Sequence, residues 1–125
     1  MNITLEMDSV SKRLGVLLKL EDDWDGDGAP PVNPSAKLAA EAFHKHIRDS
    51  VQADNGSYIY PHSNATTTGG VELTYSGERR IVYVGFEPDS DILDVAIKEP
   101  GTRSVRRHMN YDAALATISG LHSRK

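Results

Sequence analysis

Residues 71–98 read VELTYSGERRIVYVGFEPDSDILDVAIK, and this stretch decides the fold. Residues 71–75 alternate strictly between apolar and polar side chains, which is typical of a strand with one buried face. Ser76 and Gly77 then predict a tight hairpin turn. Residues 80–86 are apolar on both faces and indicate a central strand. We therefore expect antiparallel strands joined by short turns.

The pattern extends in both directions from this stretch. Residues 92–98 place alternate apolar side chains on one face and predict a further strand. After a Pro-Gly turn, residues 102–108 are a candidate edge strand. Before the stretch, residues 58–60 are a short strand candidate that ends at a proline, and residues 62–70 are expected to form a polar loop.

Two helices are expected before the sheet. Residues 8–21 carry apolar side chains at helical spacing, and Asp8 or Ser9 is a suitable N-cap. Asn33 is expected to cap a second helix over residues 34–50, with proline at its first position. The expected buried faces are Val10, Leu14, Leu17 and Leu18 in the first helix, and Ala36, Ala39 or Ala40, Phe43 and Ile47 in the second.

A third helix is expected over residues 110–121, capped by Asn110 or Asp112. Its apolar surface is expected to come from Ala113, Leu115, Ala116, Ile118 and Leu121. The fold class is thus α+β in a single domain, residues 1–125, with two N-terminal helices within residues 8–50. A four- to five-stranded antiparallel meander follows within residues 57–108, and the C-terminal helix packs on one sheet face.

Composition excludes several classes of site. The chain has 125 residues, 38% of them hydrophobic, and no cysteine, which excludes disulfides, thiolate zinc sites and cysteine nucleophiles. No apolar run reaches the roughly 20 residues that a membrane helix needs. The first ten residues lack the pattern of a signal peptide. We expect a cytoplasmic protein with no membrane partner.

Charge is unevenly distributed along the chain. The formal net charge is −4, and the first half carries it, with 10 acidic and 6 basic residues in residues 1–62. From residue 103 onward the chain is basic. Phosphate neutralisation supplies most nucleic-acid affinity, so an acidic protein is not expected to bind nucleic acid in general.

The loop over residues 22–33 is the most unusual segment. Asp23, Asp25 and Asp27 match the opening of a calcium loop, but proline stands where the closing bidentate glutamate belongs, so calcium binding is only a weak alternative. The favoured interpretation is structural: the aspartates bond backbone N–H groups in turns, and Trp24 packs between the two helices. As a partner-binding surface, the acidic rim consists of Glu21, Asp22, Asp23, Trp24, Asp25 and Asp27.

A second candidate surface is basic. With nearby tyrosines, it resembles a sheet face that binds single-stranded nucleic acid. The alternative that we favour is a solvated face with cross-strand ion pairs to Glu72, Glu78 and Asp94. The basic residues are Arg79, Arg80, Lys98, Arg103, Arg106 and Arg107.

No pattern predicts catalysis or a cofactor. The chain has no nucleophile elbow, P-loop or dinucleotide motif. The histidines do not have the spacing of a zinc site on a helix, and all five are expected on the surface: His44, His46, His62, His108 and His122. We expect a protein that is not an enzyme and binds no cofactor.

The acidic loop and the start of the strand expected at residues 71–75 resemble a known group of proteins. Residues 24–30, WDGDGAP, and residues 69–73, GGVEL, resemble a group of small bacterial and prophage proteins with a W-D-G-x-G-A-x-P loop between two helices and a G-G-V-x-L strand after them. The acidic Asp27 departs from this group, and the chain after Arg103 has no counterpart in it. The resemblance implies a common fold and a partner-binding role near mobile elements or toxin–antitoxin genes.

Three functions follow as expectations. The first is a non-enzymatic protein–protein interaction module of the mobile-element or toxin–antitoxin-accessory type, whose partner is another protein. The second is a phage-encoded inhibitor of a host defence complex, anti-CRISPR-like, which uses the acidic loop to mimic phosphate. The third is a weak divalent-metal or nucleic-acid-binding module. An exposed edge strand would also permit a homodimer.

Overall fold

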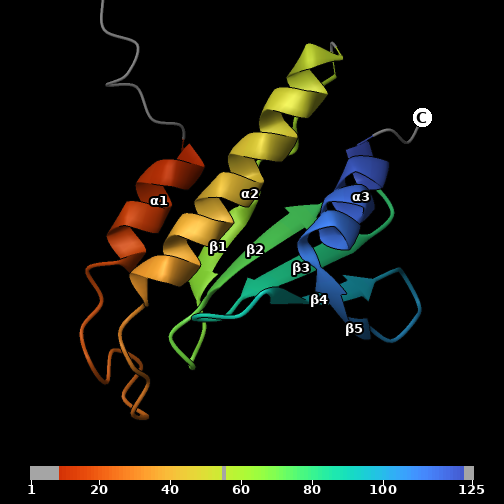
Figure 1. The fold of residues 1–125 in the computed structure, drawn as a ribbon. Helices are drawn as coiled ribbons and strands as arrows, with labels where there is room; N and C mark the ends of the chain where they lie inside the picture. The colour runs from red at the N-terminus through yellow and green to blue at the C-terminus, as the bar shows by residue number, and fades with distance from the viewer. Residues whose placement is uncertain (1–8, 55, 123–125) are drawn as a thin grey trace, which may run out of the picture.

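The computed structural model describes residues 9–54 and 56–122, and these form an α+β fold. The five strands make one antiparallel sheet in the order β1-β2-β3-β4-β5, a simple meander (Figure 1). This confirms the expected class and the fifth strand. The elements are α1 (Ser9–Leu17), α2 (Pro34–Ala53), β1 (His62–Ala65), β2 (Val71–Ser76), β3 (Ile81–Phe86), β4 (Ile92–Lys98), β5 (Val105–Asn110) and α3 (Tyr111–His122).

The sheet has one covered and one uncovered face. Leu73, Val84 and Val95 lie side by side on β2, β3 and β4 and are fully buried, because the helices lie over this face (Figure 1). Residues that alternate with these and point to the other face, such as Tyr83 and Asp94, are only partly buried. Among the described residues, no helix covers that second face. This division follows from the alternation of side chains along each strand.

Phe43 of α2 occupies the centre of the core. Its ring meets Phe86 of β3 edge-on at 5.3 Å between centroids, and Tyr111 of α3 at 5.6 Å. One aromatic side chain thus joins two helices to the sheet. Truncating such a residue to alanine typically costs about 3–5 kcal/mol.

The N-terminal helices differ from expectation at their ends. Asn33 caps α2 as expected, since its side chain accepts the Ser35 N–H at 2.8 Å, but the helix continues to Ala53. Helix α1 begins at Ser9 and ends at Leu17, four residues before the predicted end. Tight i to i+3 bonds follow, which turn the chain and leave Leu18 exposed. Asp8 lies outside the described residues.

Two expectations about the start of the sheet are wrong. Residues 58–60 form no strand, and β1 lies in the segment expected to be a loop. Ser63 of β1 pairs with Leu73 of β2 and is buried despite its polarity. The sequence of β1, HSNA, has no apolar alternation to predict it.

Residues 58–60 instead belong to a buried polar network. The Tyr58 hydroxyl lies 2.8 Å from both the His44 Nδ1 and the Tyr75 hydroxyl, and all three residues are buried. His44 is therefore in the core, which corrects the expectation that every histidine lies on the surface. Burial raises the pKa of Tyr75. The His122 ring stacks on Tyr58 with centroids 5.2 Å apart.

At the C-terminal end, the expected helix forms, and its buried face is confirmed in part. Asn110 is the cap, since its Oδ1 accepts the Ala113 N–H at 2.8 Å. The residues buried from α3 are Ala114, Ile118 and Leu121, whereas Ala113 and Ala116 are exposed. Ile118 and Leu121 are thus buried as expected and Leu115 is partly buried, while the alanines were misassigned because they give little contrast between helix faces.

Candidate interaction surface at the β5 edge

Strand β5 is an outer edge of the sheet. It pairs on one side with β4, from Ile92 opposite Asn110 to Ile97 opposite Val105, and its other side meets no described strand. Its bounds are shifted from the predicted residues 102–108. An edge strand presents unpaired backbone N–H and C=O groups, which form a template for another strand.

Both ends of β5 are held in place. Before it, the Thr102 backbone N–H and side-chain hydroxyl bond the Glu99 carbonyl at 3.1 and 2.9 Å, and Gly101 takes a positive φ of 74° in the same turn. After it, Asn110 caps α3, as described above. These bonds make residues 99–102 a turn, and the strand starts after it, at residue 105. The edge is thus fixed in an extended form.

The side chains of β5 are mostly solvent-exposed. Arg106 and His108 point to the uncovered face of the sheet, and Arg107 points to the opposite face. Val105 is 50% exposed, a high value for a β-branched apolar residue within a strand. Only Met109 is partly buried, where Thr117 of α3 contacts its sulfur at 3.6 Å.

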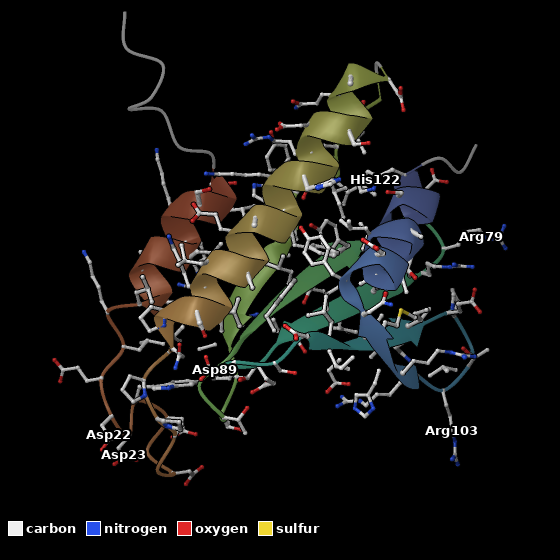
Figure 2. The ribbon with its side chains drawn as sticks, viewed as in Figure 1. Asp22, Asp23, Arg79, Asp89, Arg103 and His122 are labelled. Atoms are coloured by element: carbon white, nitrogen blue, oxygen red, sulfur yellow. The ribbon has the colours of Figure 1, made fainter. Side chains whose placement is uncertain are left out.

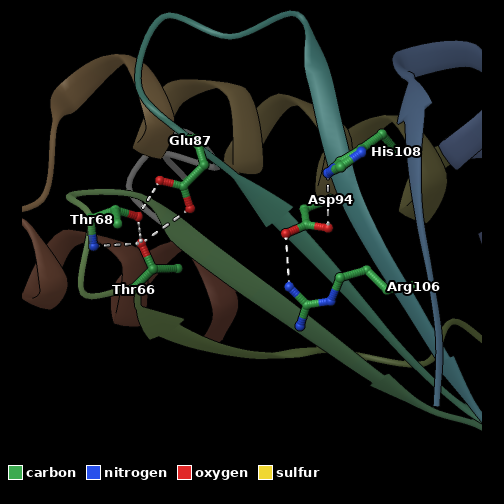
Figure 3. A network of polar contacts seen from close by, with 6 residues as sticks. All are labelled: Thr66, Thr68, Glu87, Asp94, Arg106 and His108. Atoms are coloured by element: carbon green, nitrogen blue, oxygen red, sulfur yellow. Dashed lines mark hydrogen bonds and ion pairs between the residues drawn. The ribbon is translucent and has the colours of Figure 1, made fainter.

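A shallow hollow lies beside this edge on the uncovered face, with polar groups on two sides (Figure 3). On one side, Glu87 accepts hydrogen bonds from the hydroxyls of Thr66 and Thr68. On the other, Asp94 accepts from Arg106 at 3.1 Å and lies 3.8 Å from the His108 Nε2. Tyr83 and Glu72 also line the hollow. Glu87 and Asp94 thus already accept hydrogen bonds from neighbouring side chains, whereas Glu72 accepts none among the described residues.

The carboxyl of Glu72, in this hollow, has a raised pKa. Burial raises the pKa of its carboxyl, Arg106 opposes that rise, and the charge of Asp94 adds to it. Neither Glu72 nor the Thr66–Thr68–Glu87 group was singled out from the sequence as a site. Residues 66 and 87 are 21 positions apart, so only the pairing of the strands brings them together.

The acidic loop lies at the far end of the molecule from the β4–β5 turn (Figure 2). Asp23 accepts the Gly28 N–H at 2.6 Å, and Asp25 accepts the N–H groups of Asp27 and Ala29 at 2.9 and 3.0 Å. The bonds from the Asp27 and Ala29 N–H groups lower the pKa of Asp25. The loop thus has the turn bonds that the structural interpretation predicted.

Trp24 is not in the hydrophobic core, which corrects the expectation that it packs between the helices. It is partly buried, and its indole N–H donates to the Pro30 carbonyl at 2.9 Å across the base of the loop. Its role in the structure is to close the loop. Glu21, Asp22 and Asp27 are exposed, so the outer rim of the proposed acidic surface is accessible.

The basic candidate residues do not form one face. Arg79 and Arg80 lie in the β2–β3 turn and Arg103 in the β4–β5 turn, and Figure 2 shows Arg79 and Arg103 extending away from the ribbon. Arg80 pairs with Glu99 at 3.1 Å, and Lys98 bonds the Thr102 carbonyl. The predicted cross-strand ion pairing holds for Asp94, while Arg80 uses Glu99 rather than Glu78.

Within residues 9–54 and 56–122, no group of three or more histidine, aspartate or glutamate residues is arranged to hold a metal ion. None of the helices in this part of the chain is both long and apolar enough to cross a membrane. Comparison of the chain with protein-family models, with curated proteins and with solved structures finds no match.

Proposed function

We propose that this protein is a non-enzymatic protein-binding module, whose β5 edge receives an extended segment of a partner protein. The observation that carries the proposal is a six-residue edge strand, held at both ends, with its outer backbone side free of any described strand. Strand addition uses such an edge, because main-chain hydrogen bonds supply affinity while neighbouring side chains supply specificity.

Protein binding fits this surface better than nucleic-acid binding. Arg106 and Tyr83 share the uncovered face, but Glu72, Glu87 and Asp94 line the same hollow. A nucleic-acid strand lying across this face would pass over these carboxylates, which repel a phosphate backbone because it needs net positive charge along its path.

The other expected functions have less support. The phosphate-mimic proposal needs the acidic loop to present its charges outward, yet Asp23 and Asp25 each use an oxygen for backbone bonds within the loop. The same bonds compete with calcium for these oxygens. The resemblance of the Trp24 loop to mobile-element proteins supports a partner of the toxin or defence-complex type, which stays part of this proposal.

The test uses two proline variants at adjacent positions, Arg106→Pro and Arg107→Pro. Successive residues of an antiparallel strand direct their N–H groups to opposite sides. One proline therefore removes an outward N–H, while the other breaks a hydrogen bond to β4 and destabilises the sheet. Thermal unfolding identifies which variant keeps the wild-type stability. Each protein is then tagged and used for affinity capture from its native host, with mass spectrometry.

We expect the wild type to capture a stoichiometric protein that the stable proline variant does not capture. The matched control is the double variant Asp22→Asn and Asp27→Asn in the exposed acidic loop, which we expect to capture that protein as the wild type does. Equal capture by the stable proline variant, or loss only in the loop variant, would refute binding at β5.

A further inference from the structure

The region around β5 has an excess of positive charge with few partners. Residues 100–111, PGTRSVRRHMNY, contain no acidic residue. Arg106 makes one ion pair, with Asp94, and 67% of its side chain remains exposed. Among the described residues, Arg103 and Arg107 form no ion pair. A guanidinium has five N–H donors, so most of the donors on this edge are available to a ligand.

The charges lie on both sides of the position that an added strand would occupy. Arg106 and His108 face the uncovered side of the sheet, and Arg107 faces the other side. Side chains of an added strand also alternate between these two sides. A segment with two adjacent acidic residues would therefore meet cations on both faces, and an apolar residue near its end would meet the exposed Val105.

A second copy of this chain does not fit the edge. Antiparallel pairing of two β5 strands centred between Arg106 and Arg107 would set each arginine opposite the other, and pairing over the whole strand would set Arg107 opposite His108. Like charges directly opposite one another destabilise a strand pair. Basic residues on an edge are also a known means of preventing self-pairing. A second copy of this chain is therefore a weaker candidate for this edge than a different protein.

We infer that the partner segment bound at β5 is an extended, acidic stretch of a different protein, with adjacent aspartate or glutamate residues that pair with Arg106 and Arg107. The inference rests on the proposed function and adds the chemistry of the partner to it. Its direct support is the complementarity between the exposed cations of the edge, of which only Arg106 and His108 have an acidic neighbour among the described residues, and an acidic strand.

The experiment uses two capped heptapeptides, TVDEVTV and its neutral counterpart TVNQVTV, titrated into the ¹⁵N-labelled full chain. Binding is followed through the backbone amide signals of residues 105–110. We expect both peptides to shift these signals and the acidic one to bind about three- to tenfold more tightly at low salt, a ratio that two exposed ion pairs can supply. The preference should shrink as salt is added.

Two protein variants locate the effect. The double variant Arg106→Gln and Arg107→Gln should bind both peptides equally, whereas Lys12→Gln with Lys19→Gln, two exposed residues outside the sheet, should keep the preference. Equal affinity of the wild type for both peptides would overturn the acidic preference and leave strand addition standing. Shifts confined to other residues, or no binding by the acidic peptide, would also overturn it. If the acidic preference fails in this way, loss of the native partner in the stable proline variant, but not in the Arg→Gln variant at the same position, would still support the proposed function.

Discussion

Arg106 of β5 donates a hydrogen bond to Asp94 of β4 at 3.1 Å, diagonally across the uncovered face of the sheet (Figure 3). This pair connects the edge strand to the hollow beside it. Because Arg106 is 67% and Asp94 35% exposed, water screens the attraction, and the pair positions Arg106 more than it stabilises the fold.

We expect Asp94→Asn to lower the free energy of unfolding by less than about 1 kcal/mol, the range of exposed ion pairs. Chemical denaturation measures this change. Glu99→Gln is the matched control, because it removes the Arg80–Glu99 pair at the same 3.1 Å. A loss of several kcal/mol in Asp94→Asn alone would mean that the pair is a main support of the sheet.

The Glu72 carboxyl predicts a pH dependence of stability. Its pKa is raised in the folded chain by burial, with Asp94 adding to the rise, so folding favours the protonated form. This contribution is present at low pH and is lost as the pH rises from the ordinary glutamate range through the raised pKa. Glu72→Gln should therefore become more stable relative to the wild type as the pH rises through that window. Thermal unfolding of both proteins at a series of pH values measures this. A stability difference that stays constant with pH would contradict the prediction.

The buried hydroxyl of Tyr58 bonds both His44 and Tyr75, so Tyr58→Phe should remove one hydrogen bond from the His44 Nδ1 and one from the Tyr75 hydroxyl. Unsatisfied buried groups cost about 1–3 kcal/mol each. We expect a loss of about 2–4 kcal/mol in chemical denaturation. Tyr75→Phe, which leaves the His44–Tyr58 bond intact, should cost less. The reverse order would show that Tyr75 is the centre of the network.

In the acidic loop, Asp25→Ala should release the N–H groups of Asp27 and Ala29. Their amide hydrogens should then exchange faster with solvent, while Asp27→Ala should leave the Ala29 amide unchanged. The lowered pKa of Asp25 means that these bonds persist below the ordinary aspartate range and weaken as the pH falls through the lowered value. Unchanged exchange at Ala29 in the Asp25 variant would remove the structural role of that carboxylate.

The sequence predicts the elements whose side chains alternate clearly. Strands β2, β3 and β4 lie where apolar residues alternate or cluster, and Asn33 and Asn110 mark the helix starts through their capping chemistry. Strand β1 is missed, because HSNA has no alternation of apolar and polar residues to signal a buried face. Ser63 is buried through its pairing with β2, which is a tertiary effect.

The site is less predictable than the fold. The basic residues of β5 are visible in the sequence, but which of them form ion pairs depends on which acids reach them in space. Asp94 reaches Arg106 only because β4 and β5 pair in one register. Glu72 and Glu87 join the hollow through the pairing of other strands, and His44 is buried beside Tyr58, to which it is hydrogen-bonded. No local pattern carries these relationships.

Hydrogen exchange of the captured complex tests the central proposal most directly. Backbone amides on the outer side of β5, residues 105–110, should exchange slowly in the complex and rapidly in the free protein, because an added strand would bond them. The amides of residues 21–27 should exchange equally in both. Protection confined to residues 21–27, with β5 unchanged, would contradict binding at the β5 edge and make the acidic loop the interface.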